Sequence, residues 1–122
     1  MARRGRGELE ARVMDVLWAS DAAMTPRDVH SVISTTRRPL AYTTVMTILV
    51  RLWEKGMLDR DEHGRAFAYR PVAGREEWTA GRMHELLEQA GDPGVALTHF
   101  VQSIDAREVA QLRRALEGRR RK

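Results

Sequence analysis

Apolar residues recur at helical spacing in two segments at the start of the chain. In the first, residues 8–20, the apolar stripe consists of Leu9, Val13, Val16 and Leu17, widened by Met14 and Trp18. The second begins at Thr25-Pro26-Arg27-Asp28, where threonine is an N-cap, proline occupies the first helical position and aspartate closes a capping box. This second helix buries Val29, Val32 and Ile33, and we expect it to end near Thr36, ahead of Pro39.

A third helix is predicted from Leu40 to Gly56, and its two faces differ in chemistry. The apolar face consists of Ala41, Val45, Ile48, Leu49 and Leu52. The opposite face consists of Thr43, Thr44, Thr47, Val50 and Arg51, closed by Glu54 and Lys55. Short hydroxyls and methyls let a helix approach base edges closely, and an arginine reaches phosphate or guanine. The pattern indicates a helix that reads DNA; the alternative is that three threonines share an exposed face by chance.

A β-hairpin follows the third helix. Residues 57–61 and 66–72 alternate between large and small or charged side chains, and residues 62–65 form a polar tip that contains Gly64. The order is then helix, helix, helix, hairpin, with a short turn between the second and third helices. The predicted class is mainly α with a small β-hairpin, a winged helix-turn-helix.

The chain becomes purely helical after residue 73, with predicted helices at 75–89 and 95–102 and a third that opens at a capping box, Asp105-Ala106-Arg107-Glu108. Such a short segment is near the size at which a lone core is too small to be stable. Its apolar faces must rest on another surface, and a second copy is the simplest one, giving a two-fold homodimer. The alternative is packing on residues 1–72. We therefore expect a DNA-binding domain at 1–72 and a dimerisation arm with a basic tail at 73–122.

Charge distribution agrees with this division of the 122 residues. Residues 1–72 contain 12 Lys/Arg against 9 Asp/Glu, residues 73–118 contain 5 against 8, and the final RRRK is basic. A basic domain joined to an acidic arm suits a protein whose first part alone binds a polyanion. The absence of an apolar signal or membrane segment and of cysteine favours a cytoplasmic protein without disulfides.

The residue types argue against an enzyme. No nucleophile with a paired base and no glycine-rich phosphate loop is visible, and alternating charge in a hairpin explains Asp59, Asp61 and Glu62. The four histidines lack ligand spacing, so we expect no metal site and no cofactor. The tryptophans Trp18, Trp53 and Trp78 adjoin apolar stripes, which is typical of core or interface anchors.

The motifs GELE…VMDVLW, the Thr-Pro start of the second helix, and AYTTVMTILVRLWEKGML followed by a hairpin ending in YRPV occur in order. In this the chain resembles the penicillinase-repressor family (BlaI/MecI type) of bacterial transcription factors, from Glu8 to about Leu116. The resemblance implies a winged-helix domain, a dimerising arm, and repression by occupation of a palindromic operator on double-stranded DNA.

The resemblance also implies site residues. The DNA contacts would be Tyr42, Thr43, Thr44, Thr47, Arg51 and, at the hairpin tip, Arg65. The dimer contacts would be Trp78, Leu86, Leu87, Phe100, Val109 and Leu112. Met46 and Val50 are candidates for contact with thymine methyls, with Met46 in the core as the alternative. The N-terminal arginines of RRGR are candidate phosphate contacts, whereas the RRRK tail is interpreted as a solubilising segment.

Two departures from the family affect regulation. In some members a sensor-linked protease, the implied partner, cuts an Asn–Phe bond in the arm, but here histidine replaces asparagine and the candidate bond is His99–Phe100. Copper-responsive relatives end in a Cys-x-Cys hook, which a chain without cysteine excludes.

The predicted function is a dimeric repressor. The alternatives are a ligand-sensing winged-helix regulator and, from a different class, a winged-helix adaptor that binds another protein.

Overall fold

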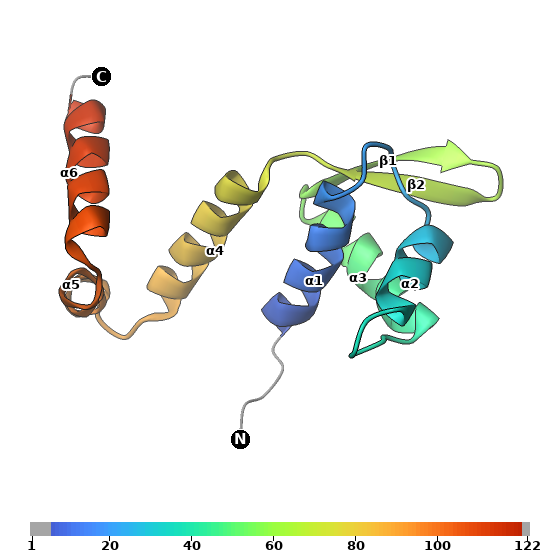
Figure 1. The fold of residues 1–122 in the computed structure, drawn as a ribbon, viewed down its shortest axis with the longest axis horizontal. Helices are drawn as coiled ribbons and strands as arrows, with labels where there is room; N and C mark the ends of the chain where they lie inside the picture. The colour runs from blue at the N-terminus through green and yellow to red at the C-terminus, as the bar shows by residue number, and fades with distance from the viewer. Residues whose placement is uncertain (1–5, 121–122) are drawn as a thin grey trace. The chain divides into compact units, whose positions relative to one another are not determined.

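The computed structural model describes residues 6–120, which form six helices and one antiparallel hairpin (Figure 1). The elements are α1 (Arg6–Trp18), α2 (Pro26–Ser34), α3 (Tyr42–Glu54), β1 (Leu58–His63), β2 (Ala66–Pro71), α4 (Arg75–Gln89), α5 (Pro93–Ser103) and α6 (Ala106–Arg120). The mainly α class with a hairpin is therefore confirmed. The chain forms two compact units, one up to Trp78 and one from Thr79 onward, so that α4 contributes to both.

The start of α2 is the capping box that the sequence predicts. The Asp28 backbone N–H donates to Thr25 Oγ1 at 3.2 Å, and the Thr25 N–H donates to Asp28 Oδ2 at 3.0 Å. The bond from the Thr25 backbone, followed by the interaction with the Thr25 hydroxyl, holds the pKa of the Asp28 carboxyl below its ordinary value. A lowered pKa means that the ionised carboxylate stabilises the fold above the ordinary pKa. That contribution is lost as pH falls through the lowered value.

Thr25→Ala is therefore expected to lower the free energy of unfolding by about 1 kcal/mol, because the first turn of α2 loses an acceptor for its free N–H groups. Urea denaturation at neutral pH measures the change. Ser31→Ala is the matched control, since Ser31 is exposed on the same helix and its hydroxyl makes no hydrogen bond within residues 6–120. Equal stability of the Thr25 and Ser31 variants would contradict this account of the cap.

The core of the first unit lies between α1, α2, α3 and the hairpin. Its buried side chains are Val13, Met14, Leu17, Val29, Ile33, Val45, Ile48, Leu49, Leu52, Leu58 and Tyr69. The strand-like segment before α2 joins the hairpin, since Met24 and Tyr69 exchange two backbone hydrogen bonds of 2.9 and 2.8 Å. The part of the hairpin at Leu58, Ala68 and Tyr69 thus belongs to the packed unit, whereas residues 61–67 are exposed.

Four of the five predicted core residues of the third helix are buried, at 0–2% exposure: Val45, Ile48, Leu49 and Leu52. The prediction was wrong for Ala41, which is exposed. Ala41 is the N-cap, with an extended backbone (φ −64°, ψ 150°), so it lies outside the helical periodicity that was used to place it. Val32, predicted to be buried in α2, is also exposed.

The hairpin is longer than the sequence predicted. Strand pairing runs from Leu58↔Pro71 to His63↔Ala66, so Glu62 and His63 belong to β1 and the turn contains only Gly64 and Arg65. Gly64 has φ +65°, and such a positive φ at the first position of a two-residue turn favours glycine. The predicted four-residue tip was wrong because polar side chains on both faces of an exposed strand resemble a loop.

The three arm helices begin and end close to the predicted positions. Asp105 and Glu108 form the expected capping box of α6, with hydrogen bonds of 2.8 and 3.1 Å. Asp92 caps α5, so Pro93 and Gly94 open that helix and do not belong to the preceding break. Helix α6 continues through Gly118 to Arg120, so the basic segment begins within the helix. In the described part of the chain, no helix is both long and apolar enough to span a bilayer.

Candidate nucleic-acid interface

The polar face of α3 is turned to solvent. We call Tyr42, Thr43, Thr44, Thr47 and Arg51 the recognition face. Tyr42, Thr43 and Thr47 are exposed, and Thr44 and Arg51 are half-buried. The four buried residues of the same helix anchor its other side in the core, so the recognition face is presented on a rigid element. Met46 is 38% exposed and adjoins this face, which excludes it from the core.

Hydrogen-bonding groups on the recognition face remain available. Within residues 6–120 the hydroxyls of Thr43 and Thr44 make no hydrogen bond, and Arg51 forms no ion pair. Thr47 differs, because its hydroxyl donates to the Thr43 carbonyl at 2.9 Å. A free arginine fork between short hydroxyls is a set of donors that can reach phosphate oxygens or the O6 and N7 atoms of guanine.

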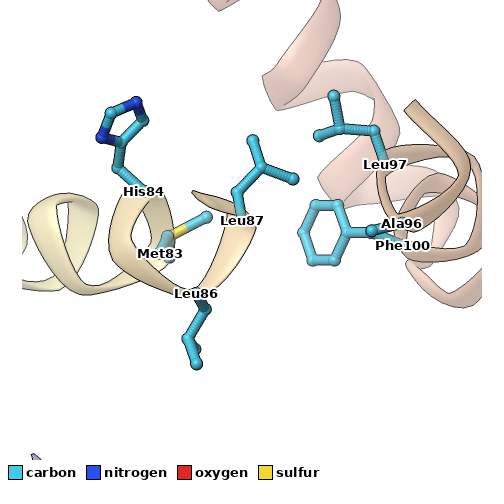
Figure 2. Close-up of a pocket in the computed structure, with 7 residues that line it drawn as sticks. All are labelled: Met83, His84, Leu86, Leu87, Ala96, Leu97 and Phe100. Carbon is cyan, nitrogen blue, oxygen red and sulfur yellow. The ribbon is translucent and has the colours of Figure 1, made fainter. Parts of the chain in front are cut away.

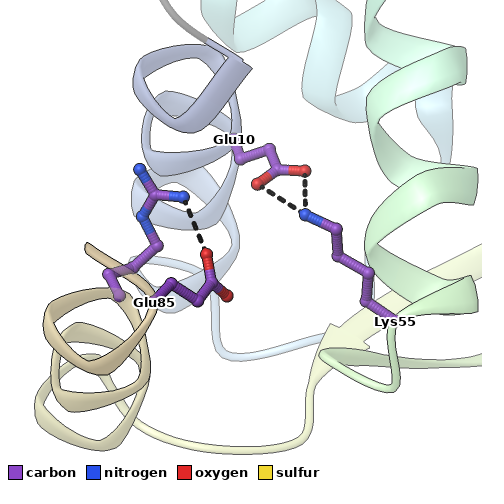
Figure 3. A network of polar contacts seen from close by, with 4 residues as sticks. Glu10, Lys55 and Glu85 are labelled. Carbon is purple, nitrogen blue, oxygen red and sulfur yellow. Dashed lines mark hydrogen bonds and ion pairs between the residues drawn. The ribbon is translucent and has the colours of Figure 1, made fainter. Parts of the chain in front are cut away.

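An ion pair fastens the carboxyl end of α3 to α1. Lys55, the C-cap residue, donates to Glu10 Oε1 at 3.2 Å and Oε2 at 3.0 Å, and Glu10 is only 2% exposed (Figure 3). A buried carboxylate needs such a partner to offset its desolvation. At the other end of the helix, Arg12 donates to Thr36 Oγ1 at 3.1 Å and to the Arg38 carbonyl, which ties the preceding turn to α1.

Arg65 lies at the tip of the hairpin, which is the wing of this fold. It is exposed, and within the described residues it has no ion-pair partner. By contrast, Arg70 on the same hairpin is 2.7 Å from Asp61, whose carboxylate raises the pKa of the Arg70 guanidinium. Arg65 is therefore the wing cation free to meet a phosphate. The N-terminal arginines at positions 3 and 4 lie outside the described residues.

Sequence reasoning missed Arg60. It lies within residues 57–61, which the sequence predicts as the first strand of the hairpin with no role for this side chain, whereas its guanidinium stacks on Trp53 and Phe67, with its carbon 3.5 and 3.9 Å from the two ring centroids. The alternation along the two predicted strands was available as a signal, because residues opposite each other and their diagonal neighbours share one sheet face, and this places Arg60 on the face of Phe67 and Tyr69. The contact of Arg60 with Trp53 could not be predicted in this way, because Trp53 belongs to α3 and not to the hairpin.

The arm exposes much of its apolar surface. None of the residues from Thr79 to Arg120 is buried, and the apolar side chains of Leu86, Leu97 and Phe100 are 62%, 48% and 45% exposed. An apolar hollow of about 500 Å³ lies between α4 and α5, and Figure 2 shows Leu87, Leu97 and Phe100 pointing into it. Exposed apolar area of this extent marks an interaction surface.

The remaining predicted dimer contacts occupy different environments. Leu87, Val109 and Leu112 are half-buried in the arm. Trp78, at the end of the first unit, packs edge-on against Trp18 with ring centroids 5.6 Å apart, so α1 already covers part of it. His99 and Phe100 are both exposed within α5. Proteases bind extended backbone, so cutting the bond between them would require α5 to unwind, and cleavage there stays a prediction.

Three helices with a paired hairpin and an exposed polar third helix define the winged helix-turn-helix class of DNA-binding regulators. The penicillinase repressor family model matches residues 6–118. The chain is 49% identical over 113 residues to the transcriptional regulator BlaI of Mycobacterium tuberculosis, in both strain CDC 1551 / Oshkosh and strain ATCC 25618 / H37Rv, covering 90% of this chain and 81% of each relative. The chain therefore belongs to the penicillinase repressor family of transcriptional regulators, whose role is not enzymatic.

Solved structures are similar to parts of the chain. The solution structure of the DNA binding domain of the repressor BlaI has 31% identity and a TM-score of 0.49, covering 56% of this chain and 80% of that one. The crystal structure of wild-type MarR from E. coli, in its apo form, has 20% identity and a TM-score of 0.48, covering 91% of this chain and 75% of that one.

Proposed function

We propose that this protein is a homodimeric repressor that occupies a palindromic operator, with one recognition helix of each subunit in the major groove. The observation that carries the proposal is the recognition face on α3, which is exposed or half-buried and free of ion pairs in the described chain, on the side of the helix opposite four buried residues. A helix built in this way can enter a groove without rearrangement of its own unit.

In this proposal the contacts to base edges supply sequence specificity, and the contacts to phosphates supply much of the affinity. Arg51 and the threonines of the recognition face contact base edges and flanking phosphates, and Arg65 contacts a phosphate beside the minor groove. The phosphate contacts make binding steeply dependent on salt, because each one releases condensed counterions from the duplex.

Dimerisation belongs to the arm. The apolar hollow between α4 and α5 and the exposed leucines around it supply a surface that a second copy covers. A two-fold dimer presents two recognition helices in opposite directions, so the operator has inverted half-sites. Repression then needs only steric exclusion of polymerase, in the cytoplasm where the DNA is, and no chemical step.

Selection of duplexes from a random-sequence library with the full chain tests the proposal. We expect inverted half-sites with centres about 10 base pairs apart, or a small multiple of that spacing. The affinity for the selected duplex should fall as salt is raised, with several counterions released. Failure to enrich any sequence, or binding that ignores salt, would refute DNA recognition and favour a protein-interaction role.

A further inference from the structure

The guanidinium of Arg60 fills the space between the recognition helix and the wing. It lies 3.5 Å from the centroid of Trp53, in the last turn of α3, and 3.9 Å from the centroid of Phe67 on β2. Its Nη1 also donates to Tyr69 Oη at 3.3 Å. The arginine of one strand thus contacts the helix on one side and the neighbouring strand on the other.

Arginine is well suited to the position between two aromatic rings. The guanidinium is flat and weakly hydrated, so both of its faces can rest on aromatic rings while its charge is retained. Tyr69 is 2% exposed, whereas Trp53 and Phe67 are 38% and 36% exposed. The stack therefore extends outward from the buried core along the seam between α3 and the hairpin.

This stack restrains the wing at a third point, nearer its turn. The hairpin is joined to α3 through residues 55–57, and its other backbone anchor is the pair of bonds between Met24 and Tyr69. Both anchors lie toward the end of the hairpin away from the Gly64-Arg65 turn. Phe67 stands nearer the turn, opposite Glu62, so contact between Arg60 and Phe67 holds a more distal part of the hairpin against the helix.

The surroundings of Arg60 disfavour a phosphate as its own ligand. Asp59 and Asp61 flank it in sequence, and the exposed Glu62 shares its face of the hairpin. Asp61 is paired with Arg70, but Asp59 and Glu62 form no ion pair within the described residues, and their negative charge repels a phosphate near Arg60. Arg65, beyond them at the turn, is the cation placed to meet the duplex.

We propose that Arg60 is a positioning residue: it fixes the angle between the wing and the recognition helix, and it affects DNA binding through Arg65 without touching DNA. The proposal rests on the proposed function. Removal of Arg60 should release the wing, so that Arg65 loses its phosphate while α3 keeps its own contacts.

A double-mutant cycle tests this on the full chain, with the duplex recovered by selection and fluorescence anisotropy at several salt concentrations. Arg60→Gln and Arg65→Ala should each weaken binding about fivefold and lower the slope of log K against log salt by about 1.8, because each substitution removes one phosphate contact from both subunits of the dimer. The double variant should bind no more weakly than Arg65→Ala alone, because both substitutions remove the same contact.

Two further variants keep the test independent of stability and net charge. Phe67→Leu removes one aromatic ring of the stack, at a side chain that is 36% exposed, without changing the net charge. This substitution should lower the DNA affinity of the otherwise wild-type protein but should not lower the affinity of the Arg65→Ala protein further. Arg70→Gln removes one charge from the same hairpin and should leave the affinity close to that of the wild type, since Arg70 is paired with Asp61.

Additive losses in the double variant, about 25-fold with the slope lowered by about 3.6, would show a direct contact and overturn the proposal. Wild-type affinity of Arg60→Gln or of Arg65→Ala, or an equal loss in Arg70→Gln, would overturn it too. These outcomes all require that the wild type binds the duplex, so they are distinct from failure of the proposed function, in which no duplex is bound at all.

Discussion

Arg51→Ala is expected to weaken binding of the selected operator by about 1–3 kcal/mol, or roughly 5- to 150-fold. Arg51 is half-buried on the recognition face and has no ion-pair partner within residues 6–120, so its guanidinium is free for a base or phosphate. The substitution removes that donor and leaves the core of α3 intact, because Arg51 is absent from the buried cluster.

Gel shift or anisotropy titration measures this loss, and sedimentation shows whether the variant keeps the oligomeric state of the wild type. Arg114→Ala is the matched control, because Arg114 is an exposed arginine of α6 that lies far along the chain from the recognition face. An Arg51→Ala protein with unchanged affinity would remove Arg51 from the site. A loss that is equally large in the Arg114 variant would indicate a general charge effect.

The second large effect is expected from removal of the arm. A protein shortened to residues 1–78 retains the packed unit, including the contact of Trp78 with Trp18, but lacks the exposed apolar surface of the second unit. We expect it to sediment as a monomer and to bind the operator at least about 100-fold more weakly, because two linked half-site contacts become one.

A full-length variant distinguishes the effect of lost dimerisation from other effects of deleting residues 79–122. Leu86→Asp places a charge on a side chain that is 62% exposed in the single subunit, so the subunit itself should remain folded while the dimer weakens. Glu88→Gln, on the same helix and exposed, is the control. A shortened protein that stays dimeric, or a dimeric Leu86→Asp protein with full affinity, would contradict the assignment of dimerisation to the arm.

Local signals accounted for most of the fold. Thr25 and Asp28 form the predicted cap because a capping box depends on residues three positions apart, which the sequence shows directly. The buried face of α3 followed from its period of 3.6 residues. The prediction that Ala41 is buried was wrong because the spacing of apolar residues does not show at which residue a helix begins.

The rest depended on contacts between elements distant in sequence. The stack of Arg60 on Trp53 and Phe67 joins α3 to the hairpin, and no spacing rule within one element predicts it. The same holds for Glu10, an acidic residue in α1 that is buried because Lys55, 45 positions later, reaches it. Such pairs arise only once packing has brought the elements together.

The most direct test of the central claim is whether operator DNA covers the outer face of α3. The chain contains no cysteine, so Met46→Cys introduces a single thiol beside Thr47 and Arg51. Ala110→Cys on α6 provides an exposed control. With the duplex in saturating excess, we predict that alkylation of Cys at position 46 slows at least about tenfold while alkylation at position 110 is unchanged. Equal alkylation rates at position 46 in the free and the DNA-bound protein would contradict the account.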